Sequence, residues 1–160
     1  MSMEIRVGIS DYKVAKSPHK IMTLGLGSCV GIAIYDKVNE IGGLSHIMLP
    51  DSSFFHGDIK PEKFADLAIP KMVEDITNGN NRRNNLVAKI AGGASMFNFS
   101  DNANGNIGYR NVVAVEEKLK ELGIPILAKD VGGNMGRTMI VDLETFIVNI
   151  RMVNREIITL

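Results

Sequence analysis

The sequence TLGLGSCVGIAIYD, residues 23–36, decides the fold, because an apolar strand enters a glycine-spaced turn and a second apolar strand leaves it. Gly25 and Gly27 are expected to give the backbone a positive φ and to leave room for a substrate. The same turn carries Cys29, the one cysteine of the chain. The backbone N–H groups of Ser28 and Cys29 can face a developing oxyanion there. A lone thiol at such a turn is a candidate nucleophile.

The pairing of the next two strands predicts which residue lies near this cysteine. Apolar runs at Val30–Asp36 and residues 41–49 flank a short connection and are typical of an antiparallel hairpin. With a two- or four-residue connection, the facing pairs are Asp36 with Ile41, Gly31 with His46, and Cys29 with Met48. His46 then shares a face of the sheet with Cys29, at roughly 7 Å between backbone positions. A three-residue connection or a bulge would reverse this facing.

The residues alone leave two readings of this pair open. A cysteine beside glycine is often a small buried apolar residue with no chemical role. His46, however, lies in an otherwise apolar strand, where an imidazole without a partner is costly to bury. Thr23, one strand earlier, can accept a hydrogen bond from an imidazole nitrogen, although threonine is also an ordinary strand residue.

The order of the remaining elements predicts an α+β fold in one domain, residues 1–160. Two amphipathic helices are expected, from Pro61 to Ile76 and over residues 109–122. The first strand expected is residues 4–9, which continues after a bend through residues 11–15. The other strands expected besides the hairpin are residues 21–24, 86–90, 124–131, Arg137–Asp142 and 146–153, with residues 154–160 as an edge or frayed segment. Strands before, between and after two helices favour a layered sandwich of mixed β-sheets covered by the helices.

Composition narrows the class of partner and the compartment. Basic and acidic residues number 18 each, so net charge gives no reason to expect nucleic acid or direct membrane insertion. No apolar run is long enough to span a bilayer, and the N-terminal residues do not resemble a signal peptide, so a cytoplasmic location is expected. A single cysteine cannot form an internal disulfide, which agrees with a reducing compartment.

The loop at residues 51–60 is the main segment without a predicted element. Phe54 and Phe55 mark a substrate or partner surface if both rings are exposed, whereas one ring tucked under the loop is the structural alternative. Asp51, His56 and Asp58 are a weak candidate for a metal site, and neither a metal nor a cofactor is expected. Glycines at Gly92 and Gly93 follow a strand without the spacing of a phosphate-binding loop, so they indicate close backbone packing or a substrate-facing loop.

Several motifs together resemble the CheD family of chemoreceptor glutamine deamidases. They are TLGLGSCV, SHIMLP, AKIAGGASMF, NIGYRN and DVGGNMGR, and they extend over nearly the whole chain. The resemblance implies Cys29 as nucleophile, His46 as base and Thr23 as the residue that orients the histidine. It also implies that the substrates are glutamines on the cytoplasmic helices of methyl-accepting chemoreceptors, and that a CheC-type phosphatase is a partner.

Two other functions use the same residues. A cysteine amidase acting on a different amide would need the same three side chains. A non-enzymatic adaptor that only regulates the phosphatase would use Cys29 as a structural residue. Conversion of receptor glutamines separates the first alternative from a deamidase, and the effect of a Cys29 substitution separates the second.

Overall fold

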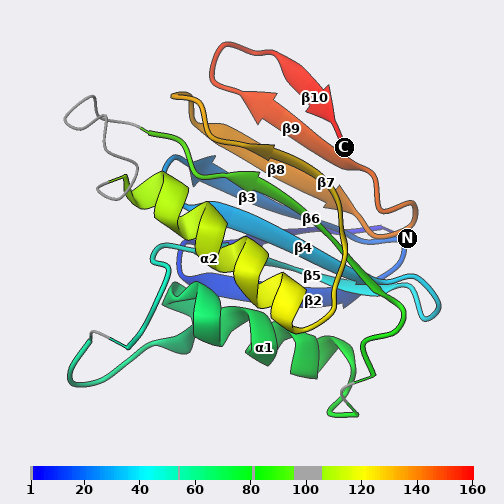
Figure 1. Ribbon diagram of the computed structural model, residues 1–160. Coiled ribbons are helices and arrows are strands. Elements are labelled where there is room, and N and C mark those ends of the chain that lie inside the picture. Colours follow the sequence, from blue (N-terminus) through cyan, green and yellow to red (C-terminus); the bar gives the residue numbers. More distant parts are fainter. Residues whose placement is uncertain (1, 54, 81, 96–105) are drawn as a thin grey trace.

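The computed structural model describes residues 2–53, 55–80, 82–95 and 106–160. Its strands and helices follow the predicted order along the chain (Figure 1). The elements are β1 (Glu4–Val7), β2 (Asp11–Lys16), β3 (Lys20–Leu26), β4 (Val30–Asp36), β5 (Ile41–Ile47), the 3₁₀ turn η1 (Pro61–Lys63), α1 (Ala65–Ile76), β6 (Leu86–Gly92), α2 (Ile107–Glu121), β7 (Ile126–Val131), β8 (Arg137–Asp142), β9 (Val148–Met152) and β10 (Ile157–Thr159).

The strands form two five-stranded sheets. One has the order β1-β3-β8-β9-β10 and the other the order β2-β5-β4-β6-β7. Each sheet contains one parallel pair, β1 with β3 and β6 with β7, among antiparallel neighbours. The sheets are therefore mixed, and the predicted α+β sandwich is confirmed.

The sheets and helices stack as three layers. Helices α1 and α2 cover one face of the β2–β7 sheet, and the second sheet packs against its other face (Figure 1). Two neighbouring glycines of β5 show how closely both layers approach. A Cβ atom at Gly43 would lie 2.8 Å from the sulfur of Met72 in α1, and one at Gly42 would lie 2.7 Å from Leu143 beside the second sheet. Alternate residues of β5 thus face helices and sheet in turn.

The predicted hairpin register is confirmed along both strands. Asp36 pairs with Ile41 and Gly31 pairs with His46 across a four-residue connection. The ladder ends at Val30 and Ile47, one position short of the expected pairing of Cys29 with Met48. That pairing is absent because the N–H groups of Met48 and Leu49 both donate to the carbonyl of Lys63, at 2.9 and 3.0 Å. The two chains therefore separate at the candidate site.

Two boundaries differ from the expected ones for local physical reasons. The first helix was expected from Pro61, but Phe64 is extended, with φ of −115° and ψ of 135°, and bridges to Leu49, so α1 begins at Ala65. The second helix begins at Ile107 because the side chain of Asn106 accepts a hydrogen bond from the N–H of Tyr109 at 3.1 Å, as an N-cap does.

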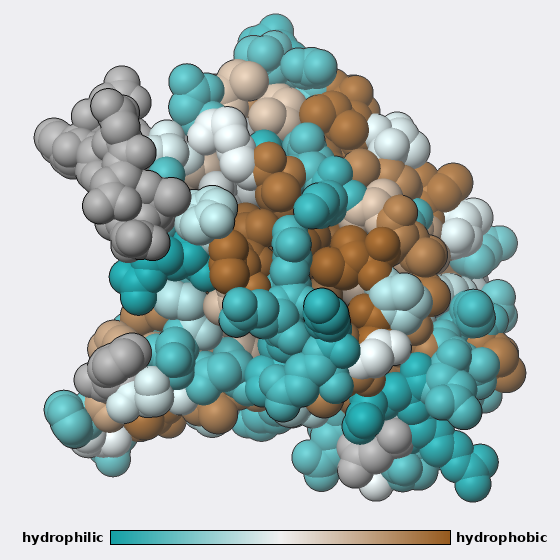
Figure 2. All heavy atoms as spheres, viewed as in Figure 1, coloured by the Kyte–Doolittle hydropathy of each residue, from teal (hydrophilic) through white to brown (hydrophobic). Residues whose placement is uncertain are grey.

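The outer surface of the helix layer is mixed in character. Apolar side chains are visible there among polar ones, without forming one continuous area (Figure 2). Among the residues that the structure describes, no helix is long and apolar enough to cross a membrane.

Candidate active site

The turn between β3 and β4 is held from behind by the chain that leaves β6. The N–H of Gly93 donates to the carbonyl of Cys29, and the N–H of Ala94 donates to that of Gly27, both at 2.8 Å. A Cβ atom at Gly92 would lie 2.3 Å from the Cys29 carbonyl oxygen, so a larger residue there would displace the turn. The interpretation of Gly92 and Gly93 as close-packing residues is confirmed.

The two glycines of the turn differ in conformation. Gly25 has a φ of 71°, which agrees with the prediction, and is exposed. Gly27 does not have a positive φ, so that part of the prediction is wrong. Its N–H donates to Gly25 at 3.0 Å while its carbonyl accepts from Ala94, and these two hydrogen bonds fix its backbone without a left-handed conformation.

Cys29 lies almost entirely inside the protein. Its side chain belongs to the apolar cluster between the two sheets, and the residue is 8% exposed. Burial raises the pKa of the Cys29 thiol, which its own backbone N–H partly opposes by favouring the thiolate. The thiol is therefore protonated at neutral pH and needs a base before it can attack a substrate.

His46 and Thr23 meet between the sheets. Nδ1 of His46, on β5, lies 2.7 Å from Oγ1 of Thr23, on β3. The same hydroxyl donates its hydrogen to the carbonyl of Val7 at 2.8 Å. In the contact with His46, the hydroxyl oxygen must therefore be the acceptor. Nδ1 must then carry the hydrogen, and Nε2 is the nitrogen with a free lone pair.

The second ring nitrogen of His46, Nε2, is unprotonated at neutral pH. The residue is 2% exposed, and burial lowers its pKa to about 4, so the imidazole is neutral at pH 7. Among the described residues, Nε2 has no hydrogen-bond partner. His46 and Cys29 both point into the layer between the sheets, which confirms the predicted common face, but they do not form a hydrogen bond with each other.

The backbone N–H groups of Ser28 and Cys29 lie at the turn that carries the thiol. Within the described part of the chain, they donate to no backbone carbonyl. These are the two positions at which the sequence predicted oxyanion donors.

Arg137 contributes to this end of the molecule and was missed in the sequence. Its guanidinium donates to Asp130 at 2.9 Å and to the carbonyls of Gly92 and Gly132 at 3.3 and 2.8 Å. Arg137 is 5% exposed and belongs to the sheet opposite to Asp130, so the ion pair joins the two sheets. Its contact with Gly92 supports the residue that packs on Cys29. The sequence signal for this buried contact is a single arginine at the start of an otherwise apolar strand.

Asn111 is the second residue that was missed. It is fully buried in α2, and its Nδ2 donates to the carbonyls of Ser28 and Met48, both at 2.9 Å. Its position four residues before Val115 and eight before Leu119 places a polar residue in the apolar stripe of the helix. An amide in such a stripe indicates a buried partner, and this signal is readable from sequence.

The predicted aromatic surface is only partly described. Phe54 lies outside the described residues. Phe55 is 46% exposed, and its ring packs edge-on against Phe64 with centroids 4.9 Å apart. The ammonium group of Lys63 lies 5.9 Å from the centre of the same ring. Phe55 is therefore half covered, and its outer part remains open to a partner. In the described part of the chain, no three metal-ligating side chains form a cluster.

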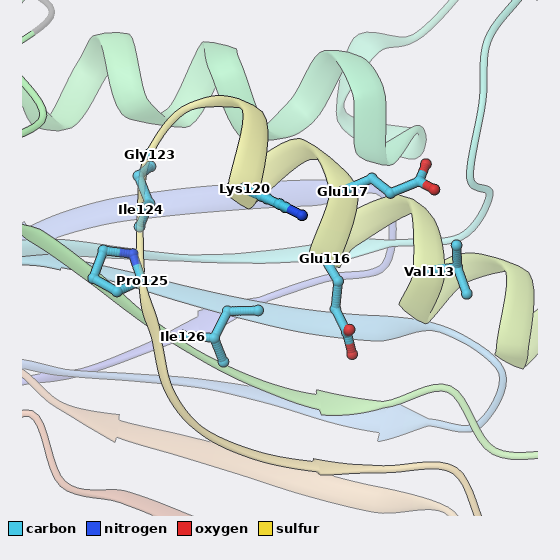
Figure 3. Close-up of a pocket in the computed structure, with 8 residues that line it drawn as sticks. All are labelled: Val113, Glu116, Glu117, Lys120, Gly123, Ile124, Pro125 and Ile126. Atoms are coloured by element: carbon cyan, nitrogen blue, oxygen red, sulfur yellow. The ribbon is translucent and has the colours of Figure 1, made fainter.

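A separate pocket lies away from these residues. It has a volume of about 700 Å³ and lies between the C-terminal half of α2 and the start of β7. Figure 3 shows Glu116 and Ile126 on its two sides, with Pro125 and Gly123 in the connecting segment. Cys29, His46 and Thr23 do not line it.

Comparison with known proteins identifies the family. Residues 48–152 match the family described as CheD chemotactic sensory transduction. A protein of Clostridium botulinum strain Hall, named "Probable chemoreceptor glutamine deamidase CheD", is 61% identical over 94% of this chain and 93% of its own. A Clostridium acetobutylicum protein of the same name is 57% identical over 94% of this chain and 91% of its own. The chain therefore belongs to the CheD family.

Proposed function

We propose that this protein is a glutamine deamidase that converts specific glutamines of methyl-accepting chemoreceptors to glutamate. The observation that carries the proposal is the hydrogen bond between Thr23 and His46, which leaves Nε2 of the histidine free in the layer that contains the only cysteine. The names of the clostridial relatives support the reaction and the class of substrate.

The proposed reaction begins with proton transfer from Cys29 to Nε2 of His46. The thiolate attacks the side-chain carboxamide carbon of the glutamine, and the carbonyl π electrons move to oxygen. The N–H groups of Ser28 and Cys29 stabilise this oxyanion in the tetrahedral intermediate. His46 then protonates the departing nitrogen, which leaves as ammonia and yields a thioester.

Water completes the cycle. His46 removes a proton from the water that attacks the thioester carbon, and the sulfur leaves as the carbon–oxygen bond forms. The proton that His46 took from water then passes to the thiolate and regenerates the thiol. The net change is carboxamide plus water to carboxylic acid plus ammonia. Thr23 keeps the hydrogen on Nδ1 throughout, so that Nε2 always serves the reacting side of the ring.

Burial determines the resting state of the proposed pair. It raises the pKa of Cys29 and lowers that of His46, so the thiol and the imidazole are both neutral before substrate binds. An ion pair forms at the moment of attack, when the substrate carbonyl and the oxyanion donors lie beside the sulfur. The enzyme at rest is thus a weak nucleophile toward small electrophiles.

The proposal also includes a partner. A CheC-type phosphatase would bind near the site, with the open part of Phe55 on the surface that faces the receptor or the phosphatase. The support for this partner is the family resemblance and the half-exposed ring of Phe55.

The test is the conversion of receptor glutamines, measured by mass spectrometry of receptor cytoplasmic fragments before and after incubation. Cys29→Ser keeps the volume but replaces the thiol by an alcohol of far higher pKa, so conversion should fall by about a thousandfold or more. Val38→Ser, at the exposed turn that joins β4 to β5, at the hairpin end opposite to Cys29 and His46, is the control and should convert at the parent rate. Phosphatase binding should survive Cys29→Ser.

Three results would contradict the proposal. Equal conversion by Cys29→Ser and the parent would reject the nucleophile. Phosphatase binding by a parent protein that converts no receptor glutamine would indicate the adaptor function instead. Ammonia release from other amides without receptor conversion would indicate a cysteine amidase with another substrate.

A further inference from the structure

The carboxamide of Asn111 joins the two chain segments that carry Cys29 and His46. One of its N–H bonds reaches the carbonyl of Ser28, directly before the cysteine, and the other reaches the carbonyl of Met48, two residues after the histidine. Both nitrogen–oxygen distances are 2.9 Å. Because both acceptors are carbonyls, Nδ2 must be the atom that faces them, and the orientation of the amide is settled by its contacts.

This contact lies where the hairpin ladder has ended. β4 and β5 pair as far as Val30 and Ile47, and beyond that pair the chain after β5 turns to the carbonyl of Lys63. The chain before β4 turns instead to Gly93 and Ala94. No ladder hydrogen bond therefore fixes the separation of the two segments at the site.

The helix that carries Asn111 is itself fixed against the site. A Cβ atom at Gly108 would lie 2.4 Å from the carbonyl oxygen of Ala94, and one at Gly93 would lie 2.3 Å from the side chain of Val112. The first turns of α2 thus pack directly on the segment that supports Cys29. Asn111 reaches the two carbonyls from a rigid base.

A second observation concerns the other end of the same amide. Asn111 is 0% exposed, and among the described residues its Oδ1 has no hydrogen-bond partner. An asparagine that keeps an unpartnered oxygen in the interior carries a cost that a leucine would not. The two N–H bonds are therefore the contacts that distinguish this residue from an apolar core residue.

We infer that Asn111 is a positioning residue, which sets the distance between Cys29 and His46 by holding the carbonyls of Ser28 and Met48 together. The inference rests on the proposed function, since it concerns the proposed nucleophile and base. Asn111 touches neither of their side chains and acts through the backbone beside each. Without it the two segments can move apart at the point where the ladder ends, and the base is then too far from the thiol.

The test uses Asn111→Asp, which keeps the shape and places an oxygen against the two carbonyls, and Asn111→Ala, which removes the bridge without repulsion. For both, kcat should fall about tenfold to a hundredfold with KM nearly unchanged, because misplacement of reacting groups affects the chemical step. Val115→Ala is the matched control. It removes a fully buried side chain from the same helix, one turn away, and touches neither carbonyl.

A second readout needs no substrate. The rate at which iodoacetamide alkylates Cys29, the only thiol, is measured against pH on folded protein. If the two segments move apart, solvent reaches the buried sulfur, so the midpoint of this profile should fall in the Asn111 variants, because burial is what raises the pKa of the Cys29 thiol. Val115→Ala should lower the melting temperature and leave the midpoint unchanged. Should Asn111→Asp fail to fold, Asn111→Ala supplies both measurements.

The outcomes separate this inference from the proposed function. Parent-like kcat and midpoint in the folded Asn111 variants would overturn the positioning role and leave the deamidase proposal intact. Equal changes in Val115→Ala would also overturn it, because they would show general destabilisation. Parent-like conversion by Cys29→Ser would reject the nucleophile, whatever the Asn111 variants do.

Discussion

The two ends of the β-sandwich are closed by different kinds of contact. At the end with the 37–40 turn, the rings of Tyr35 and Phe146 stack with centroids 4.9 Å apart. The ammonium group of Lys89 lies over the Phe146 ring and donates to the carbonyls of Phe146 and Leu160, at 2.6 and 2.9 Å. The carboxylate of Asp36 accepts three hydrogen bonds from the turn.

The end with Cys29 differs in how its buried polar side chains are paired. Among the described residues, the buried side-chain atoms that make no hydrogen bond are Ser45 Oγ, His46 Nε2 and Asn111 Oδ1. His46 and Ser45 are neighbours in β5, and Asn111 contacts the residue before Cys29. A buried polar group without a partner costs stability, so these three atoms lower the free energy of unfolding at this end.

The first and largest expected effect tests whether this end works as one chemical unit. His46→Asn keeps an N–H donor for Thr23 but removes the base, so deamidation should fall about a thousandfold or more. Adding Cys29→Ser should cost little more, since neither residue acts without the other. The measurement is receptor conversion by the single and double variants. Losses that multiply would mean that the two residues act independently.

The second effect is the dependence of stability on pH that His46 contributes at this end. His46 has a pKa of about 4 in the folded protein against 6.5 for the free side chain. As pH falls from 6.5 to 4, the unfolded chain takes up a proton that the folded protein does not, so the free energy of unfolding decreases, by about 3 kcal/mol from this group.

Urea unfolding at pH 7 and pH 4 measures this change in parent and His46→Asn proteins. The variant lacks the titrating group and should lose less stability between the two pH values. Equal losses in both proteins would show that His46 is not buried in its neutral form.

A third, smaller effect concerns Thr23. Thr23→Val keeps the shape but removes the hydroxyl, so His46 loses the acceptor that selects its tautomer, and kcat should fall about tenfold. Thr23→Ser restores the hydroxyl and should recover most of the turnover. The measurement is the steady-state kinetics of each variant with a receptor fragment. Equal kcat values for the valine and serine variants would show that Thr23 is an ordinary strand residue.

The smallest effect is expected at the opposite end and completes the comparison. Phe146→Leu removes the stack with Tyr35 and should lower stability by about 1 kcal/mol. Because Phe146 is far from Cys29 along the strands, kcat per folded molecule should stay at the parent value. Thermal unfolding and kinetics on the same samples test this, and a lower kcat would show that the two ends are coupled.

The sequence was most informative where contacts are local. The alternation of apolar residues and the four-residue connection were enough to pair Gly31 with His46, because hairpin register follows from loop length. The two helices followed from their apolar spacing. That register also predicted that Cys29 and His46 lie on the same face of the sheet.

Long-range choices could not be predicted in the same way. Residues 4–9 and 11–15 were expected as one strand with a bend, yet β1 and β2 belong to different sheets. Nothing in their short, weakly alternating sequences selects a partner, since the choice depends on strands that follow much later. Likewise, the sequence shows that Arg137 and Asn111 are single polar residues beside apolar ones, but it does not show which carbonyls they contact, because every residue has a carbonyl.

The pairing of β3 with β8 has a consequence for the time at which activity can appear during synthesis. Thr23 lies between Val7 of β1 and Met139 of β8, so the strand that orients His46 finds its second neighbour only after most of the chain has been made. A ribosome-bound chain that ends before Arg137 contains Cys29, His46 and Thr23, but β3 is then paired on one side alone, with β1. Such contacts between distant residues form slowly. The nascent protein therefore carries every proposed reacting group well before it can align them.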